Sequence, residues 1–315
     1  MQADMNYEIS YGKAAVPFYR VYAAPLSGIT PIPESSFSGR ANILFAVEID
    51  VEVFGQNFLP AYTQGDNRQV VATDSMKNFI LQHALTFDGS TLEELLNLLG
   101  QQFLTIYPQM QRLRLTGREL PFASVPVPQD AAFSPSNVLF KRTHDDFAQA
   151  EMDFERSDNA IIITGHRCGQ VGLQLFKVTG SGFTRFVQDS YTTLPERSDR
   201  PLFIYLDVYW QYTDPATMLS TDHAHYVAPE QVRDLLQVVF HEFVSESIQH
   251  LVHEMGQRLL ARFPQLSEVS FSAQNRTRDP MATSEADPRV KVYSDPFSAY
   301  GVIKLTLHRT TLEQT

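Results

Sequence analysis

The chain has 315 residues, and 36 acidic against 25 basic side chains give it a formal net charge of −11. With 43% hydrophobic and 19% charged residues it has the composition of a globular protein, and at about 150 residues per domain the length predicts two domains. The acidity disfavours binding to a nucleic-acid backbone. A single cysteine, Cys168, excludes an intramolecular disulfide and a multi-cysteine zinc site.

Neither end of the chain carries a recognisable targeting signal. The first six residues are polar and acidic, whereas a signal peptide begins with basic and apolar segments. No stretch approaches the ~18 apolar residues of a membrane helix, and the final Glu313-Gln314-Thr315 is not a peroxisomal address. Because one lone thiol is typical of a reducing compartment, we expect a soluble cytoplasmic protein.

The first half of the chain predicts strands, then helices, then strands. The clearest strand covers residues 43–54, where valines and isoleucines alternate with Glu48, Asp50 and Glu52, so one face is buried and the other is acidic. Helix 91–107 is indicated by leucines at spacings of three and four. The other expected elements are strands at 7–22, 110–116 and 138–155, a helix at 75–85 and a proline-rich loop at 121–135.

The second half repeats this order. The expected elements are strands at 161–179, 202–212, 268–273, 290–293 and 301–307, and one long amphipathic helical region at 232–263. The pattern predicts an α+β fold of two tandem domains, residues 7–155 and 156–315, each pairing an antiparallel sheet with helices on one face. The uncovered sheet faces would need a partner, so we expect an oligomer whose joined sheets form a β-barrel.

Metal and hydrolase motifs are weak. His241-Glu242 is followed four residues later by Ser245, so the H-E-x-x-H spacing of a zinc helix fails. No nucleophile elbow, dinucleotide fingerprint or Walker loop is present, so serine hydrolase, dinucleotide-binding and nucleotide-hydrolysing functions lose their usual support. His250 and His253 are expected to face solvent or a helix neighbour, and His223 and His225 are expected at the surface of a polar loop.

Four short blocks occur in an order and spacing that resemble the urate oxidase (uricase) family. The blocks are Tyr11-Gly12-Lys13 with Tyr19-Arg20-Val21, Ala72-Thr73-Asp74-Ser75-Met76-Lys77-Asn78, Gly182-Phe183 with Tyr191-Thr192-Thr193-Leu194 and Asp199-Arg200, and Ser247-Ile248-Gln249 with Gln274-Asn275-Arg276-Thr277. The resemblance extends from about residue 7 to about residue 309. It implies two tunnelling-fold (T-fold) domains in a homotetramer, with active sites at the subunit interfaces.

The resemblance also implies an activity and a set of site residues. The activity is oxidation of urate by O2 and water to 5-hydroxyisourate and hydrogen peroxide, in purine catabolism, with no cofactor and no metal. Lys13 and Thr73 match the catalytic proton relay. A lysine acts as a base only where its surroundings favour the neutral amine. The residues that match substrate-binding positions are Thr73, Asp74, Phe183, Leu194, Arg200, Ile248, Gln249 and Asn275.

Individual roles follow from chemistry at those positions. A planar guanidinium at Arg200 suits the edge of an anionic purine, and the amide of Gln249 supplies a donor and an acceptor to the opposite edge. Phe183 matches the aromatic side chain that stacks on the ring, and Asn275 matches the asparagine that orients dioxygen or water. Asp74 and Ile248 match positions that use backbone groups. Many members have a relay histidine where this chain has Thr277.

Other interpretations of the same residues stay open. Arg200 could pair with Asp199 or Glu196 at the surface, and Thr73-Asp74 could be an N-cap ahead of a helix. At the level of function, the alternatives are a metal-dependent purine or pterin enzyme on the same fold, and a purine-binding protein that has lost its relay.

Overall fold

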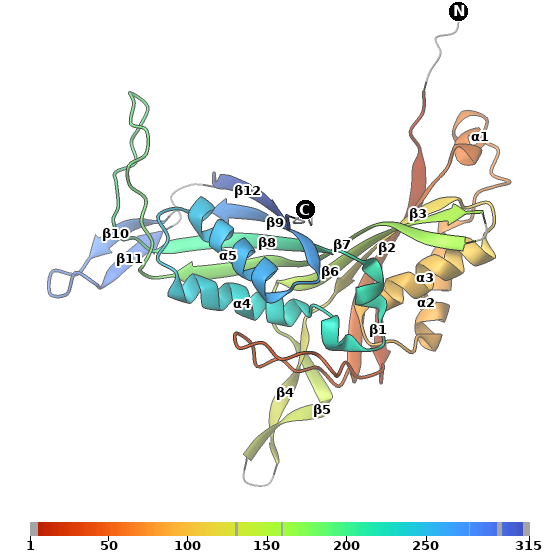
Figure 1. Cartoon of the computed structure of the whole chain (residues 1–315), viewed down its shortest axis with the longest axis horizontal. Coiled ribbons are helices and arrows are strands. Elements are labelled where there is room, and N and C mark those ends of the chain that lie inside the picture. Colours follow the sequence, from red (N-terminus) through yellow and green to blue (C-terminus); the bar gives the residue numbers. More distant parts are fainter. Residues whose placement is uncertain (1–5, 130–131, 159, 277, 295–297, 311–315) are drawn as a thin grey trace, which may run out of the picture. The chain divides into compact units, whose positions relative to one another are not determined.

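The computed structural model describes residues 6–129, 132–158, 160–276, 278–294 and 298–310, and shows a mixed α and β protein whose strand pairs are antiparallel (Figure 1). The chain divides into two compact units. The first comprises residues up to 30, 38–168 and 214–226, and the second comprises residues 31–37, 169–213 and those from 227 onward. The long strand β7 (Ala160–Lys177) contributes to both units.

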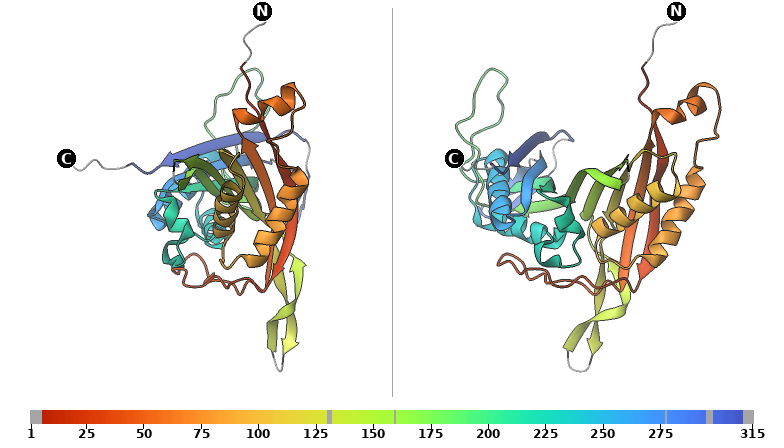
Figure 2. Two further views of the ribbon diagram at one scale, coloured as in Figure 1. Left: turned by 90° about the vertical axis from the view of Figure 1, so that its right-hand side faces the viewer. Right: turned by 45° about the vertical axis from the view of Figure 1, so that its right-hand side comes forward.

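In the first unit, strands follow the order β1-β2-β3-β6, and the first part of β7 lies beside β6. The strands are β1 (Ser10–Val21), β2 (Leu44–Phe54), β3 (Arg112–Glu119) and β6 (Phe147–Ser157). The alternation expected for β2 is present, because Val47, Ile49 and Val53 are all fully buried. Helices α2 (Thr73–Thr86) and α3 (Leu92–Ile106) pack on this buried face of the sheet (Figure 2).

Helix α3 shows how local sequence and packing agree. Thr91 caps it in a reciprocal capping box, accepting from the Glu94 N–H while the Glu94 side chain accepts from the Thr91 N–H. Its apolar stripe of Leu95, Leu99 and Phe103 is fully buried, and each such side chain contributes about 1.5–3 kcal/mol of burial. The predicted helix at 91–107 is therefore confirmed.

The second unit repeats the theme with strands in the order β8-β9-β12 and the last part of β7 beside β8. The strands are β8 (Leu202–Tyr212), β9 (Leu266–Asn275) and β12 (Gly301–His308). Helix α5 (Ile248–Arg262) packs on β9 and β12, and helix α4 (Pro229–Glu242) packs on α5. Gly256 permits the close approach, because a Cβ there would lie 2.6 Å from a Leu307 methyl carbon.

The single helix expected at 232–263 is wrong, since α4 ends at Glu242 and α5 begins at Ile248. The apolar periodicity continues through the break, but tertiary contacts interrupt the helix. Ser245 forms a β-bridge with Ser181 and accepts a hydrogen bond from the Gly182 N–H at 2.7 Å. Ser247 then caps α5 by accepting from the His250 N–H.

The proline-rich loop expected at 121–135 is also wrong. Residues 122–142 form a hairpin of β4 (Phe122–Gln129) and β5 (Ala132–Arg142), which projects from the first unit (Figure 1). Pro126 and Pro135 pair across it beside a register shift. A two-stranded ribbon tolerates proline because each strand has one partner, so N–H groups on the outer edge are not needed for pairing. The strand expected at 138–155 is likewise divided, into part of β5 and β6.

The remaining elements are short. They are the 3-10 helices η1 (Gln56–Phe58), η2 (Pro215–Leu219) and η3 (His223–His225), helix α1 (Leu59–Thr63), and the paired strands β10 (Asp279–Thr283) and β11 (Lys291–Ser294). Of these, only β11 was anticipated, as the strand expected at 290–293. In the described part of the chain, every helix is too short or too polar to cross a membrane.

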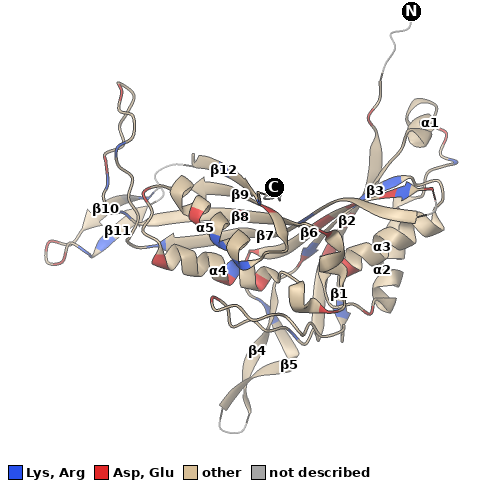
Figure 3. Ribbon diagram, viewed as in Figure 1, with Lys and Arg blue, Asp and Glu red and all other residues tan. Residues whose placement is uncertain are grey.

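The acidic face expected on residues 43–54 is largely neutralised in the first unit. Arg118 on β3 pairs with Glu48 at 3.1 Å and with Asp50 at 2.8 Å on the neighbouring β2. Arg114 makes a bidentate pair with Asp153 on β6. Charges of both signs therefore alternate across these strands (Figure 3).

Candidate active site

Several of the predicted binding residues gather at one end of the sheet in the second unit. Asn275 ends β9 and pairs with Ile204 near the start of β8. The segment 181–183 is joined to the residues before β8 and to those before α5. The Ser181 carbonyl accepts from the Arg200 N–H at 2.8 Å, and Ser181 forms a β-bridge with Ser245. The topology thus places Phe183, Arg200 and Ile248 at this end of the sheet, with Asn275.

The guanidinium of Arg200 lies over the ring of Phe183, which also stacks with Phe186. The Arg200 Cζ lies 5.3 Å from the ring centroid, and its Nε is buried with no hydrogen-bond partner among the described residues. Partial burial lowers the pKa of Arg200, and the neighbouring charge of Arg197 lowers it further. The position therefore holds a cation that lacks a balancing anion from the described chain.

The alternative interpretation of Arg200 as half of a surface ion pair does not match the geometry. The Asp199 carboxylate accepts from the Thr179 hydroxyl at 2.6 Å and from the Gly180 N–H at 2.7 Å, and these bonds lower the pKa of Asp199. Glu196 accepts from the Arg185 N–H instead. Both nearby carboxylates thus fix the loop backbone, and Arg200 stays available for a ligand.

The other binding residues of this unit differ in exposure. Ile248 is buried at the first position of α5, where backbone N–H groups are not used inside the helix. Gln249 follows it and is exposed. Leu194 is 39% exposed in the loop that precedes Arg200. The Oδ1 atom of Asn275 is buried and has no hydrogen-bond partner among the residues described.

In the first unit, Lys13 and Thr73 come from elements that pack together. Lys13 lies on β1 beside a bulge, where Ala15 has a φ of 53° and donates its N–H to Asp50. Tyr11, two residues before Lys13, accepts a hydrogen bond from the Val71 N–H at 3.1 Å. This bond ties β1 to the residues that enter α2, which begins at Thr73.

The alternative interpretation of Thr73-Asp74 as an N-cap is wrong, because Ala72 occupies the N-cap and no side chain caps α2. The Asp74 carboxylate bonds Lys77 at 2.6 Å and Asn78 at 3.2 Å. Lys77 is the main cause of the lowered pKa of Asp74, and the charge of Lys13 adds a smaller effect, so Lys13 lies near this helix start. The first N–H groups of α2 thus have no side-chain cap.

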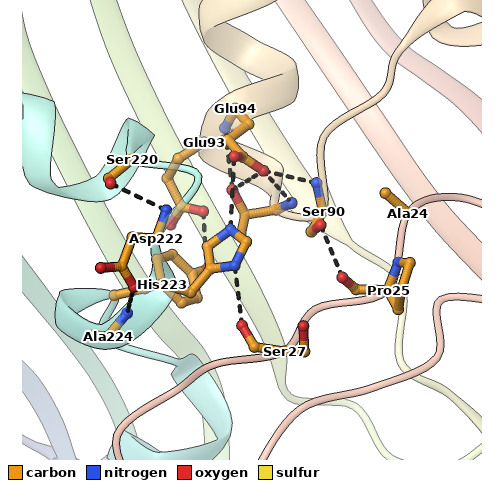
Figure 4. Close-up of polar contacts among 12 residues, drawn as sticks. Ala24, Pro25, Ser27, Ser90, Glu93, Glu94, Ser220, Asp222, His223 and Ala224 are labelled. Carbon is orange, nitrogen blue, oxygen red and sulfur yellow. Dashed lines mark hydrogen bonds and ion pairs between the residues drawn. The ribbon is translucent and has the colours of Figure 1, made fainter.

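The histidine predictions have a mixed outcome. His223 is buried, so its expected surface position is wrong: its Nδ1–H donates to the Ser27 carbonyl at 3.1 Å and its Nε2 lies 3.6 Å from Glu94 Oε1 (Figure 4). His225, His250 and His253 are exposed, as expected. Across the described ranges, His, Cys, Asp and Glu side chains do not gather in groups of three that could hold a metal.

Comparison with known proteins decides the family. The family model for uricase matches residues 53–152 and 166–304, which include most of both units. The chain belongs to the uricase family. The match covers the second-unit cluster around Arg200 and the start of α2, whereas Lys13 precedes it.

Individual relatives and structures agree with this assignment. The chain is 44% identical over 312 residues to a uricase of Haloferax volcanii, covering 97% of this chain and all of that one. It is also 44% identical to the bifunctional uric acid degradation protein PucL of Bacillus subtilis. That match covers 99% of this chain and 63% of the length of PucL. The crystal structure of Bacillus sp. TB-90 urate oxidase superposes with a TM-score of 0.93 at 42% identity, covering 96% of this chain and 100% of that one.

Some features of the site were not anticipated from the sequence. Arg197 places a second positive charge near Arg200, and Tyr11 ties β1 to the start of α2. Tyr11 lies in one of the blocks that carry the family resemblance, two residues before Lys13, and this position in the sequence could have identified it. No sequence signal could have identified Arg197, because its effect depends on a loop conformation. Thr277, at the expected relay position, lies outside the described residues.

Proposed function

We propose that the chain is a urate oxidase that converts urate, O2 and water to 5-hydroxyisourate and hydrogen peroxide. Membership of the uricase family makes it an oxidoreductase of uric acid degradation. The observation that carries the proposal is the pairing of Arg200 with Phe183, in which a cation without a counter-ion from the described residues lies over an aromatic ring. A flat, anionic, hydrogen-bonding ligand satisfies both groups at once.

In this proposal the second unit binds the purine. Arg200 forms two parallel hydrogen bonds to one edge, and Gln249 at the start of α5 bonds the other edge through its amide. Phe183 stacks on the ring face. Leu194 and the backbone N–H of Ile248 line the pocket, and the unpartnered Oδ1 of Asn275 supports its role in orienting O2 or water.

The first unit supplies the base. Thr73, at the start of α2, passes a proton from urate to Lys13, and the backbone N–H of Asp74 contacts the substrate. The position of the Asp74 carboxylate supports that assignment, because it is bonded to Lys77 and Asn78 on its own helix. The uncapped helix start also favours a negatively charged ligand.

The chemistry balances without a cofactor. Removal of a second proton gives a urate dianion, which passes two electrons to O2 and forms a hydroperoxide at a ring carbon. Hydrogen peroxide leaves, and water adds to the resulting imine to give 5-hydroxyisourate. Local positive charge stabilises the anion in a site that excludes water. Because the net charge of the chain is −11, this attraction has to come from nearby groups such as Arg200 and Arg197.

We further propose that residues 7–155 and 156–315 form two T-fold domains and that four copies assemble into a barrel. The binding group around Arg200 and the base group around Lys13 then meet across a subunit boundary. The half-exposed side chains on the open face of β8 support burial in an assembly, because this strand alternates strictly between buried and half-exposed positions.

The test is urate turnover by the purified chain in a buffer treated with a metal chelator. The expected result is loss of urate absorbance with release of one hydrogen peroxide per urate. Turnover that stops on chelation and returns with added metal would favour a metal-dependent purine or pterin enzyme instead. Tight urate binding without turnover would identify a purine-binding protein that has lost its relay.

A further inference from the structure

The side chain that follows Asn275 is held by two aromatic rings. The Arg276 guanidinium carbon lies 3.8 Å from the ring centroid of Tyr300 and 4.7 Å from that of Tyr205. Its Nη2 donates to Gln274 Oε1 at 2.5 Å. We call these four residues, Arg276, Tyr300, Tyr205 and Gln274, the Arg276 clamp. Both distances are within the range of cation–π attraction.

The clamp and Asn275 occupy opposite faces of the sheet. Along β9, Val269, Phe271 and Ala273 are buried on the face that packs against α5, and Asn275 continues this row. Side chains alternate between faces in a strand, so Gln274 and Arg276 point to the other face. Tyr205 is the cross-strand partner of Gln274 and shares that face.

The clamp lies where β9 ends. Asn275 is its last residue and is paired on one side with Ile204 and on the other with Gly301, which follows Tyr300. Arg276 extends the pairing by one step, donating its N–H to the Phe203 carbonyl at 3.0 Å. A strand end is the part of a sheet that opens most readily, so an anchor one residue beyond Asn275 limits its motion.

We propose that Arg276 is a positioning residue that fixes the direction of the Asn275 amide in the active site. This inference rests on the proposed urate oxidase function. The clamp holds Gln274 and Arg276, the residues on both sides of Asn275, on one face of the sheet. The Asn275 side chain must therefore point toward the other face. Reaction rate depends steeply on such alignment, whereas purine binding through Arg200 and Gln249 does not involve Asn275.

The experiment measures kcat, the KM for O2 and the Kd of xanthine, which lacks the C8 oxygen of urate, in Arg276→Ala. Turnover should fall about tenfold and the KM for O2 should rise, with the Kd of xanthine unchanged within about twofold. Arg289→Ala, which removes the same charge from an exposed pair with Asp287, is the matched control and should match the wild type. Tyr300→Ala should resemble Arg276→Ala, and Tyr300→Phe, which keeps the ring, should restore most of the turnover.

A double-mutant cycle separates positioning from a general structural role. If Arg276 acts through Asn275, adding Arg276→Ala to Asn275→Ala should lower turnover little further. Full additivity, or parallel losses of xanthine binding and thermal stability in Arg276→Ala, would overturn the proposal. Amide exchange at residues 273–276 should also be faster in Arg276→Ala. If the wild type oxidised no urate but exchange accelerated, the clamp would stand and the proposed function would fall; unchanged exchange would refute the clamp.

Discussion

The hydroxyl of Tyr11 accepts a hydrogen bond from the backbone N–H of Val71 at 3.1 Å, joining two segments that are 60 residues apart. Tyr11 also packs edge-on against Phe58, with ring centroids 5.1 Å apart. Burial is the main cause of its raised pKa, so the phenol stays neutral over the physiological pH range. The contact holds the entry to α2, which begins at Thr73, against β1.

Removing the base should stop turnover while leaving the ligand site intact. Lys13→Ala and Thr73→Ala should each lower kcat about 10²–10⁴-fold, the usual contribution of a positioned acid or base. The Kd of xanthine, measured by calorimetry, should change far less. Arg68→Ala removes one positive charge from an exposed pair with Asp66 in the same unit and should leave kcat unchanged. Equal losses of binding and turnover in Lys13→Ala would show that Lys13 binds the purine instead.

Removing the Arg200 cation should weaken ligand binding, in contrast to removal of the base. Arg200→Ala should weaken urate binding by about 2–5 kcal/mol, because a desolvated charge contact to the anion is lost. Arg200→Lys should recover little of this, since an ammonium lacks the planar fork and the stacking surface on Phe183. Steady-state KM and direct binding of xanthine provide the measurements. Wild-type affinity in Arg200→Lys would mean that charge alone suffices.

Activity should depend on assembly. If the base group and the binding group meet across a subunit boundary, dilution to monomers should abolish turnover even though each monomer is folded. Analytical ultracentrifugation and activity, followed over the same concentration series, should show a tetramer that loses both mass and activity together. A monomer with full activity would contradict the shared site.

A buried carboxyl in the first unit should make stability fall with rising pH. Glu93 accepts from the Tyr226 hydroxyl at 2.9 Å, and burial raises its pKa above the ordinary value of 4.5. Above that pH the unfolded chain has lost this proton, while the folded chain still holds it. Folding then takes up a proton, so the contribution of Glu93 to the free energy of unfolding declines until pH passes its raised folded pKa.

The variant Glu93→Gln tests this, because its amide is uncharged in both states. The free energy of unfolding of the wild type minus that of Glu93→Gln should decline as pH rises above the ordinary carboxyl pKa of 4.5, by at most ~1.4 kcal/mol per pH unit. Urea unfolding of the two proteins over this range gives the difference. A difference that stays constant with pH would show that Glu93 titrates alike in both states.

Arg309 should stabilise the second unit through the end of α5. Its Nε donates to the Leu266 carbonyl at 2.8 Å, and its Nη2 donates to those of Leu260 and Phe263. Arg309→Ala should lower the free energy of unfolding by about 1–3 kcal/mol, because partly buried carbonyls lose their donors. Arg289→Ala, at an exposed position, should change it by less than about 0.5 kcal/mol. Thermal unfolding distinguishes the two.

Much of the fold was predictable from the sequence because it depends on local periodicity. The alternation in β2 and the leucine spacing in α3 each specify one buried face, and the structure has both elements within a few residues of the predicted bounds. The family blocks also identified candidate site residues. A short segment such as Tyr191-Thr192-Thr193-Leu194 can be recognised in the sequence without knowledge of the structure around it.

The errors come from contacts that local patterns do not reveal. The Ser181–Ser245 bridge between distant segments breaks a helix whose periodicity continues, and hairpin pairing of β4 with β5 makes strands from proline-rich sequence. His223 is buried with its Nδ1–H donating to the distant Ser27 carbonyl and its Nε2 3.6 Å from Glu94 Oε1, which local polarity could not indicate.

The sequence by itself determined most of the long strands and helices, their order and the family, because periodicity and short motifs are properties of neighbouring residues. Only the tertiary structure decided which cations lack counter-ions. Arg200 and Arg118 are the same residue type, yet Arg118 meets Glu48 and Asp50 across a strand pair, whereas the carboxylates near Arg200 bond the loop backbone instead. Charge balance depends on distances between side chains, and those are set by the register of strands and the course of loops.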